Sequence, residues 1–153
     1  MKSEKILPLP KWVRALLIVL ALLLLATMYL FQRFNFLHFL ISHFITASGS
    51  LHPYFYFIFN KTLRLIVNDV CCFLLIFALF EKQNYLRVAF WVFLFEFLIL
   101  LPVYFILKLW LEGDAEISSP LLSQLHRLII NPTLMILLLI AFFYQRFKAE
   151  KNT

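Results

Sequence analysis

The fold is decided by one stretch, Leu63–Phe80, which reads LRLIVNDVCCFLLIFALF. The run is apolar enough to cross a bilayer, yet its first half carries Arg64, Asn68 and Asp69. Polar and ionisable side chains are costly at membrane depth and persist there only when they have partners. We therefore expect a membrane-spanning helix whose polar side faces other protein segments.

The composition of the whole chain agrees with this interpretation. Of its 153 residues, 63% are hydrophobic, 18% are aromatic and only 14% are charged, whereas an average soluble domain is about half apolar. A water-soluble fold of this length could not keep so many apolar side chains off its surface. The sequence therefore predicts an all-α, polytopic membrane protein that forms one integral membrane domain over residues 1–153.

The net charge of +6 does not indicate nucleic-acid binding, because of where the basic residues lie. They flank the first and last apolar runs, at Lys2, Lys5, Lys11, Arg14, Arg146, Lys148 and Lys151. Basic flanks are typical of membrane anchoring. We therefore expect the chain to sit in a lipid bilayer and to bind no nucleic acid.

Four apolar segments are long enough to span a hydrocarbon core of about 30 Å, which requires about 20 helical residues. These predicted spans are 12–31, 63–80, 88–107 and 127–146. Because Pro102 interrupts the third span and Asn131–Pro132 the fourth, we expect a kink in each. Ser119–Pro120 is a helix-start signal, a serine N-cap followed by proline. The last helix should therefore begin there and end near Arg146, before a frayed polar tail.

The segment between the first two spans is less regular. Phe34, Leu37 and Ile41 recur at helical spacing, and the predicted helix, 34–46, suits either an interfacial position or a re-entrant hairpin. His38 and His43 are five residues apart, which is the wrong spacing for one helical face. We interpret them, with His52, as interfacial histidines, and predict no metal site and no cofactor. Residues 108–119 are expected to form an aqueous loop.

Counting Lys and Arg predicts the orientation. With both termini cytoplasmic, nine lie on the inner side and five on the outer side, which agrees with the positive-inside rule. The outer five are Arg33, Lys61, Arg64, Lys108 and Arg127. We expect a four-span protein of the inner membrane.

We also predict that polar residues of three spans lie together within the membrane, and we call them the predicted polar cluster. Its members are Arg64, Asn68, Asp69, Glu96, Arg127 and Asn131. Arg64 and Asn68 are four residues apart and share a helical face, and Arg127 and Asn131 repeat this spacing. We expect Asp69 and Glu96 to form ion pairs with Arg64 and Arg127.

Three interpretations of this cluster remain open. It fixes the register of packed membrane helices, or it docks onto a larger membrane partner, or it is catalytic. A catalytic set would use Cys71 or Cys72 with His126 and Arg127, since nearby cations activate a thiolate. Burial of the cysteines in a span argues against this set, so we assign no catalytic residue.

Three pieces of the chain carry a resemblance to a known family. They are LRLIVND (Leu63–Asp69), a basic turn that leads into an aromatic third span, and LHRLIINP (Leu125–Pro132) followed by AFFYQ (Ala141–Gln145). The chain resembles small membrane proteins associated with exosortase F or exosortase X systems in Bacteroidetes. The resemblance covers about residues 60–146 and does not extend to Asp69 or the two cysteines.

The resemblance implies a non-enzymatic accessory of protein sorting at the bacterial inner membrane, with an exosortase as its membrane partner. Two alternatives remain: a small membrane enzyme of the cysteine transpeptidase type, and an orphan structural or transport subunit. Exosortases use a cysteine, an arginine and a histidine. In this chain, Cys72 is followed by Phe73 rather than by a Ser-Gly-type segment, which favours the accessory.

Overall fold

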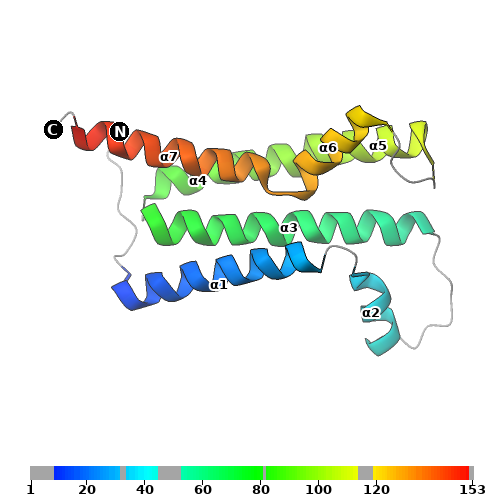
Figure 1. The fold of residues 1–153 in the computed structure, drawn as a ribbon, viewed down its shortest axis with the longest axis horizontal. Coiled ribbons are helices and arrows are strands. Elements are labelled where there is room, and N and C mark those ends of the chain that lie inside the picture. The colour runs from blue at the N-terminus through cyan, green and yellow to red at the C-terminus, as the bar shows by residue number, and fades with distance from the viewer. Residues whose placement is uncertain (1–8, 32–33, 45–52, 81, 114–118, 152–153) are drawn as a thin grey trace.

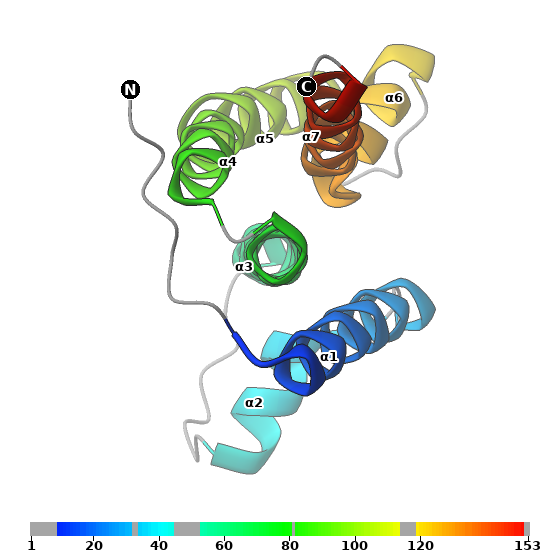
Figure 2. The same cartoon turned by 90° about the vertical axis from the view of Figure 1, so that its left-hand side faces the viewer.

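Helix α3 (Pro53–Phe80) forms the axis of the molecule (Figure 1). In the end-on view, α1 and α2 lie on one side of α3, and α4 to α7 lie on the other side (Figure 2). The computed structural model describes residues 9–31, 34–44, 53–80, 82–113 and 119–151. Within these residues the chain is all-helical, and the stretch Leu63–Phe80 lies at its centre.

Seven α-helices and one π-helical turn follow each other along the described chain. They are α1 (Lys11–Leu30), α2 (Phe36–Phe44), α3 (Pro53–Phe80), α4 (Gln83–Phe95), η1 (Glu96–Leu100), α5 (Leu101–Leu111), α6 (Pro120–Ile130) and α7 (Thr133–Lys151). The second helical span thus begins ten residues before Leu63.

Three helical runs are long and apolar enough to cross a membrane: Lys11–Leu30, Tyr54–Phe80 and Gln83–Leu111. Helices α6 and α7 pass the same test only as a pair, and they are bent by 58° at their junction. The predicted all-α fold is confirmed for the described residues, and it contains three to four candidate membrane spans by length and composition. The count of four stays a prediction.

Many large apolar side chains point away from the protein interior, as expected for helices in lipid. Trp12, Leu23, Leu98, Ile106 and Leu137 are each more than half exposed. The buried apolar residues form two clusters. One contains Cys72, Ile76, Phe80, Ala89, Met135 and Phe142, and the other contains Leu65, Leu101, Tyr104, Leu122 and Ile129.

Proline explains the irregularities in the third and fourth helical runs. Pro102 cannot donate a backbone hydrogen bond to the preceding turn, and the π-helical turn η1 lies immediately before it. In the last run, Asn131 is extended (ψ 142°) and separates α6 from α7. The kink predicted at Asn131–Pro132 is confirmed, and Ser119 caps α6 by accepting a hydrogen bond from Leu122 N at 3.3 Å.

Two predicted boundaries were wrong. Helix α5 continues to Leu111, so the predicted loop 108–119 begins four residues too early, and Lys108 is buried rather than aqueous. Helix α7 continues to Lys151, so the tail after Phe147 is helical rather than frayed. An ion pair between Arg146 and Glu150, at 3.1 Å and four residues apart, supports this last turn.

Helix α2 occupies the middle of the segment predicted as helix 34–46 and extends away from the bundle (Figure 1). Asn35 caps it by accepting a hydrogen bond from His38 N, and Asn60 of α3 accepts one from Leu37 N. Residues 45–52, which include His52, lie outside the described residues. Whether α2 lies in the interface or re-enters the bilayer stays open.

Candidate functional site

The buried polar side chains of α3 bind its neighbours through backbone carbonyl groups. Arg64 and Asn68 lie one turn apart and are both buried. Arg64 Nη2 donates a hydrogen bond to Phe31 O at 3.3 Å, and Asn68 Nδ2 donates one to Ile130 O at 2.8 Å. The first bond attaches α3 to the end of α1, and the second attaches it to the end of α6.

Both acceptors are carbonyl groups at helix ends, where an intrahelical donor is lacking. Phe31 directly follows α1, and Ile130 is the last residue of α6. At the second of these sites the chain leaves the helix at Asn131, so no following turn supplies an N–H to Ile130 O. An unsatisfied backbone group costs several kcal/mol in a hydrocarbon environment. By bonding these carbonyl groups, Arg64 and Asn68 stabilise the two helix ends.

Arg14 of α1 binds backbone carbonyl groups at the C-terminal end of α3. Its Nε donates a hydrogen bond to Ala78 O at 2.9 Å, and its Nη2 donates one to Leu79 O at 3.3 Å. A cation is favourable at a helix C-terminus because of the helix dipole. Sequence analysis placed Arg14 among the membrane anchors and missed this contact, because spacing along the chain does not reveal which helix ends lie side by side.

The two buried acidic residues pair with each other. Asp69 and Glu96 are each 2% exposed, and their carboxyl groups lie close enough to interact. Asp69 Oδ2 and Glu96 Oε2 form no hydrogen bond with the described residues. Neither forms an ion pair with Arg64 or Arg127, so the expected pairing is absent among these four described residues. Helix geometry gives the reason. Asp69 lies five residues after Arg64, about 140° around α3, so it faces η1 while Arg64 faces α1.

The remaining two members of the predicted polar cluster lie on the outside of the bundle. Arg127 and Asn131 are exposed, as is Gln124 at the same helical spacing. We call these three residues the polar face of α6. The side chains of Arg127 and Asn131 make no hydrogen bond or ion pair with the described residues. On the opposite side of α6, Leu122 and Ile129 are buried.

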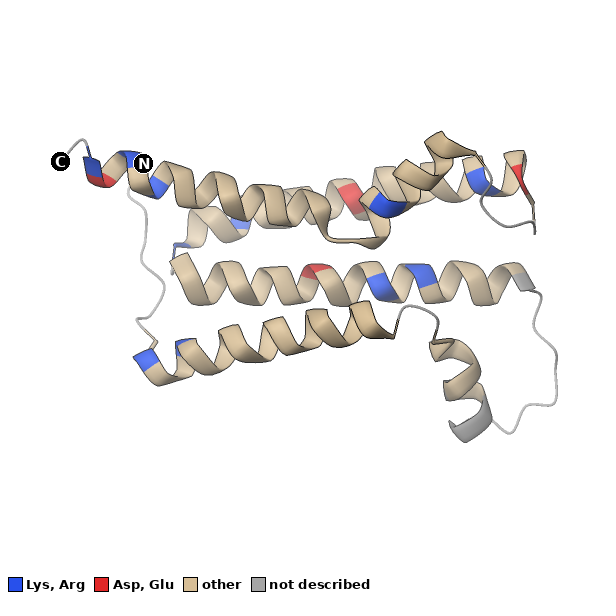
Figure 3. Ribbon diagram, in the orientation of Figure 1, with Lys and Arg blue, Asp and Glu red and all other residues tan. Residues whose placement is uncertain are grey.

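The basic residues of the described chain fall into two groups along the molecule (Figure 3). One end of the molecule carries the starts of α1 and α4 and the end of α7. All seven Lys and Arg residues at this end were predicted to lie on the inner side of the membrane. They are Lys11, Arg14, Lys82, Arg87, Arg146, Lys148 and Lys151. The other group contains Lys61, Arg64, Lys108 and Arg127, all close enough to His126 to act on it electrostatically.

Sequence analysis missed two polar contacts in this second group. The Tyr104 hydroxyl is fully buried and hydrogen-bonds His126 Nδ1 at 2.5 Å, which joins α5 to α6. Lys108 Nζ donates a hydrogen bond to Gly113 O at 2.9 Å and pairs with Glu112 at 3.9 Å. Both lysines of this region, Lys61 and Lys108, lie 5.8 Å from the centre of the Phe57 ring.

The structure does not bring the conceivable catalytic set together. Cys71 and Cys72 are each 1% exposed. Cys72 packs in the first apolar cluster, whereas His126 is bonded to Tyr104 of the second. Among the described residues, no group of three or more His, Cys, Asp or Glu side chains is arranged to hold a metal ion.

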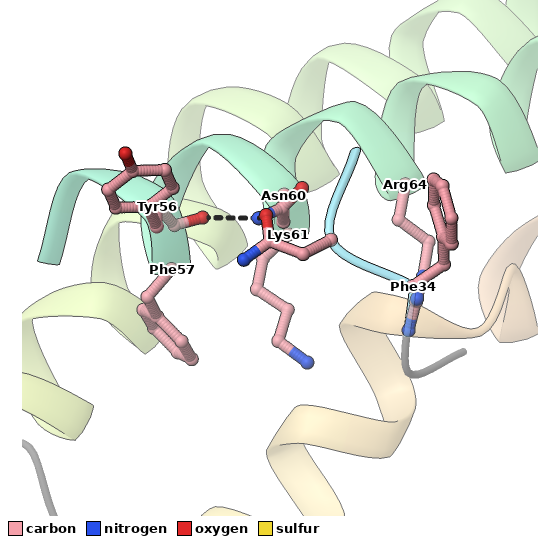
Figure 4. Close-up of a pocket in the computed structure, with 7 residues that line it drawn as sticks. Phe34, Tyr56, Phe57, Asn60, Lys61 and Arg64 are labelled. Carbon is pink, nitrogen blue, oxygen red and sulfur yellow. Dashed lines mark hydrogen bonds between the residues drawn. The ribbon is translucent and has the colours of Figure 1, made fainter. Parts of the chain in front are cut away.

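Two cavities lie on either side of Arg64. The polar cavity measures about 200 Å³ and is lined by Phe34, Asn35, Tyr56, Phe57, Asn60, Lys61 and Arg64 (Figure 4). The apolar cavity measures about 230 Å³ and lies between α1, α3 and the junction of α6 with α7. Its lining includes Leu25, Met28, Asn68 and Ile136, together with Arg64.

Comparisons with protein-family models, with curated proteins and with solved structures find no match for this chain.

Proposed function

We propose that the protein is a non-enzymatic accessory of the bacterial inner membrane that docks onto a larger membrane protein through the polar face of α6. Its termini would be cytoplasmic, at the end where the basic residues of α1, α4 and α7 gather.

The single observation that carries the proposal is the exposed guanidinium of Arg127, which has no hydrogen-bonding or ion-pair partner among the described residues.

The depth of Arg127 makes this exposure significant. We infer one hydrocarbon boundary near Ala78 and Leu79, because Arg14 bonds these residues and Lys82 follows them. A core of about 30 Å takes about 20 helical residues, so the opposite boundary falls near Asn60. Asn68 is two turns deeper.

The hydrogen bond from Asn68 to Ile130 O supports a similar depth for the end of α6. Arg127 precedes Ile130 by less than one helical turn. A polar side chain exposed on a helix at this depth is costly in lipid and typically marks a contact with another helix. A partner that supplies a carboxylate or backbone carbonyl would relieve this cost.

The class of the partner rests on the resemblance to exosortase-associated proteins. Arg127, Asn131 and Pro132 belong to the most specific part of that resemblance. The same residues form the exposed face of α6 and its junction with α7. We therefore infer that the partner is an exosortase of a C-terminal sorting system.

Co-purification tests this proposal. The full-length, tagged protein is isolated from native membranes after mild crosslinking, and exosortase is quantified beside it. We expect Arg127→Leu to lose the exosortase, because the substitution removes the exposed charge and disturbs no contact within the described chain. Arg87→Leu is the matched control, because Arg87 is an exposed arginine of α4 at the opposite end. Equal recovery with both variants would contradict the proposal.

A further inference from the structure

Two cations line the polar cavity, Lys61 and Arg64, and Lys61 has no hydrogen bond or ion pair among the described residues. Lys61 lies three residues before Arg64, and both side chains extend from the same side of α3 (Figure 4). The Lys61 ammonium group lies 5.8 Å from the centre of the Phe57 ring, in a cation–π contact. Like charges at this helical spacing repel each other, so an anion held between them would be stabilised.

The Asn60 amide of this cavity bonds neighbouring parts of the chain. Asn60 Nδ2 donates to Asn35 Oδ1 at 2.7 Å and to Tyr56 O at 2.8 Å. These bonds fix the start of α2 against α3 and hold the wall opposite the two cations. No acidic residue is among the described residues that line this cavity. Its chemistry is therefore that of a phosphate site, with an ammonium and a guanidinium group as donors.

The apolar cavity extends the site toward the membrane interior. It shares Arg64 with the polar cavity and is lined mainly by apolar residues of α1, α6 and α7. Arg64 already bonds Phe31 O at the end of α1, so its side chain is fixed between the two spaces. Together the two cavities reach the range of about 300–1,000 Å³ that is typical of small-molecule sites.

The depths of the two cavities match the parts of a phospholipid. With one hydrocarbon boundary near Leu79, the opposite one falls about 20 residues earlier, near Asn60. Lys61 then lies at headgroup level. The apolar cavity, at the level of Asn68 and Ile130, lies within the hydrocarbon.

We propose that the two cavities form a specific site for one anionic phospholipid. Lys61 and Arg64 bind its phosphate, and one acyl chain enters the apolar cavity beside Met28 and Ile136. The lipid stabilises the contact of α1 with α3 at the point where α1 ends. The site is independent of the polar face of α6 that docks the partner protein.

Native mass spectrometry of the full-length protein tests this site. The protein is released from detergent after incubation with phosphatidylglycerol or with zwitterionic phosphatidylcholine, and the retained lipid is counted. We expect one phosphatidylglycerol to be retained in preference to phosphatidylcholine. Lys61→Gln should weaken this retention about tenfold, which corresponds to about 1.4 kcal/mol.

Lys82→Gln is the matched control, because Lys82 lies over the Tyr85 ring at 5.6 Å in a similar contact at the opposite end. Ile136→Trp fills the apolar cavity and should weaken lipid retention while Lys61 is intact. Equal losses in Lys61→Gln and Lys82→Gln would overturn the proposal. Binding of soluble glycerol phosphate as tightly as phosphatidylglycerol would also overturn it, because the ligand would then be a free phosphate compound.

Discussion

Arg14 and Arg64 each cap the helix that carries the other. Arg14, near the start of α1, donates to Ala78 O and Leu79 O in the last turn of α3, and Arg64 of α3 donates to Phe31 O just after α1. Because α1 and α3 are antiparallel, the two contacts close both ends of the pair. Helix α1 has two buried residues, Ala21 and Met28, and it packs along α3 between these caps.

The first prediction concerns these caps. Arg14→Leu should lower the free energy of unfolding by about 1.5–3 kcal/mol, the usual contribution of hydrogen bonds from a charged group. Arg64→Leu should have a similar effect. The double variant should cost less than the two single changes together, because both act on the same helix pair. Reversible unfolding in mixed detergent measures all three values. If Arg14→Leu were as stable as the exposed-site control Arg87→Leu, the reciprocal caps would not matter.

A second prediction concerns the hydrogen bond from Asn68 to Ile130 O. Asn68→Leu should cost about 0.6–1.7 kcal/mol, as measured for buried hydrogen bonds between membrane helices. It should also broaden the distance distribution between spin labels at Val70 and Ile136, which are both exposed, because the junction of α6 with α7 loses its hydrogen bond to α3. Thr27→Val serves as the control, since Thr27 bonds only Leu23 O within its own helix. An unchanged distribution in Asn68→Leu would show that the junction is held by other contacts.

The third prediction concerns the contact between Asp69 and Glu96. Glu96→Leu should destabilise the protein by about 1–3 kcal/mol, because it leaves the buried carboxyl group of Asp69 without its partner. The double variant Asp69→Leu/Glu96→Leu should recover most of this loss, since both polar groups are then removed. Exchanging the two residues, as Glu96→Arg together with Arg127→Glu, should not recover the stability that single changes at these positions lose. Recovery by that charge exchange would instead support an ion pair across α6.

The fourth prediction separates an accessory from an enzyme. The double variant Cys71→Ala/Cys72→Ala should retain protein sorting, because both thiols are buried and Cys72 packs among apolar side chains. Sorting of a C-terminally tagged substrate measures the effect, and co-purification with exosortase shows whether the variant is folded and bound. Loss of sorting by a variant that still binds exosortase would favour the cysteine transpeptidase alternative.

Local signals in the sequence were sufficient for the helices and their interruptions. Ser119–Pro120 starts α6, and Asn131–Pro132 ends it, because capping and the missing proline N–H act on neighbouring residues. The central role of Leu63–Phe80 was also predictable, since buried polar residues need partners on several sides.

The pairing of the polar side chains was not predictable in the same way. The predicted polar cluster combined residues of similar depth, but depth alone does not say which face of a helix meets which neighbour. Arg64 and Asp69 point about 140° apart, so one α3 side chain contacts α1 and the other contacts η1. Lys108 was assigned to the predicted aqueous loop 108–119. Its ammonium group instead binds Gly113 O beside the Phe57 ring.

Site-specific photocrosslinking tests the central claim, docking through the polar face of α6, most directly. A photoreactive amino acid is placed at position 124, beside an intact Arg127, and for comparison at position 106 on the exposed side of α5. The account predicts that position 124 crosslinks to exosortase in native membranes and that position 106 does not. Equal exosortase crosslinking from both positions, or none from position 124, would contradict it.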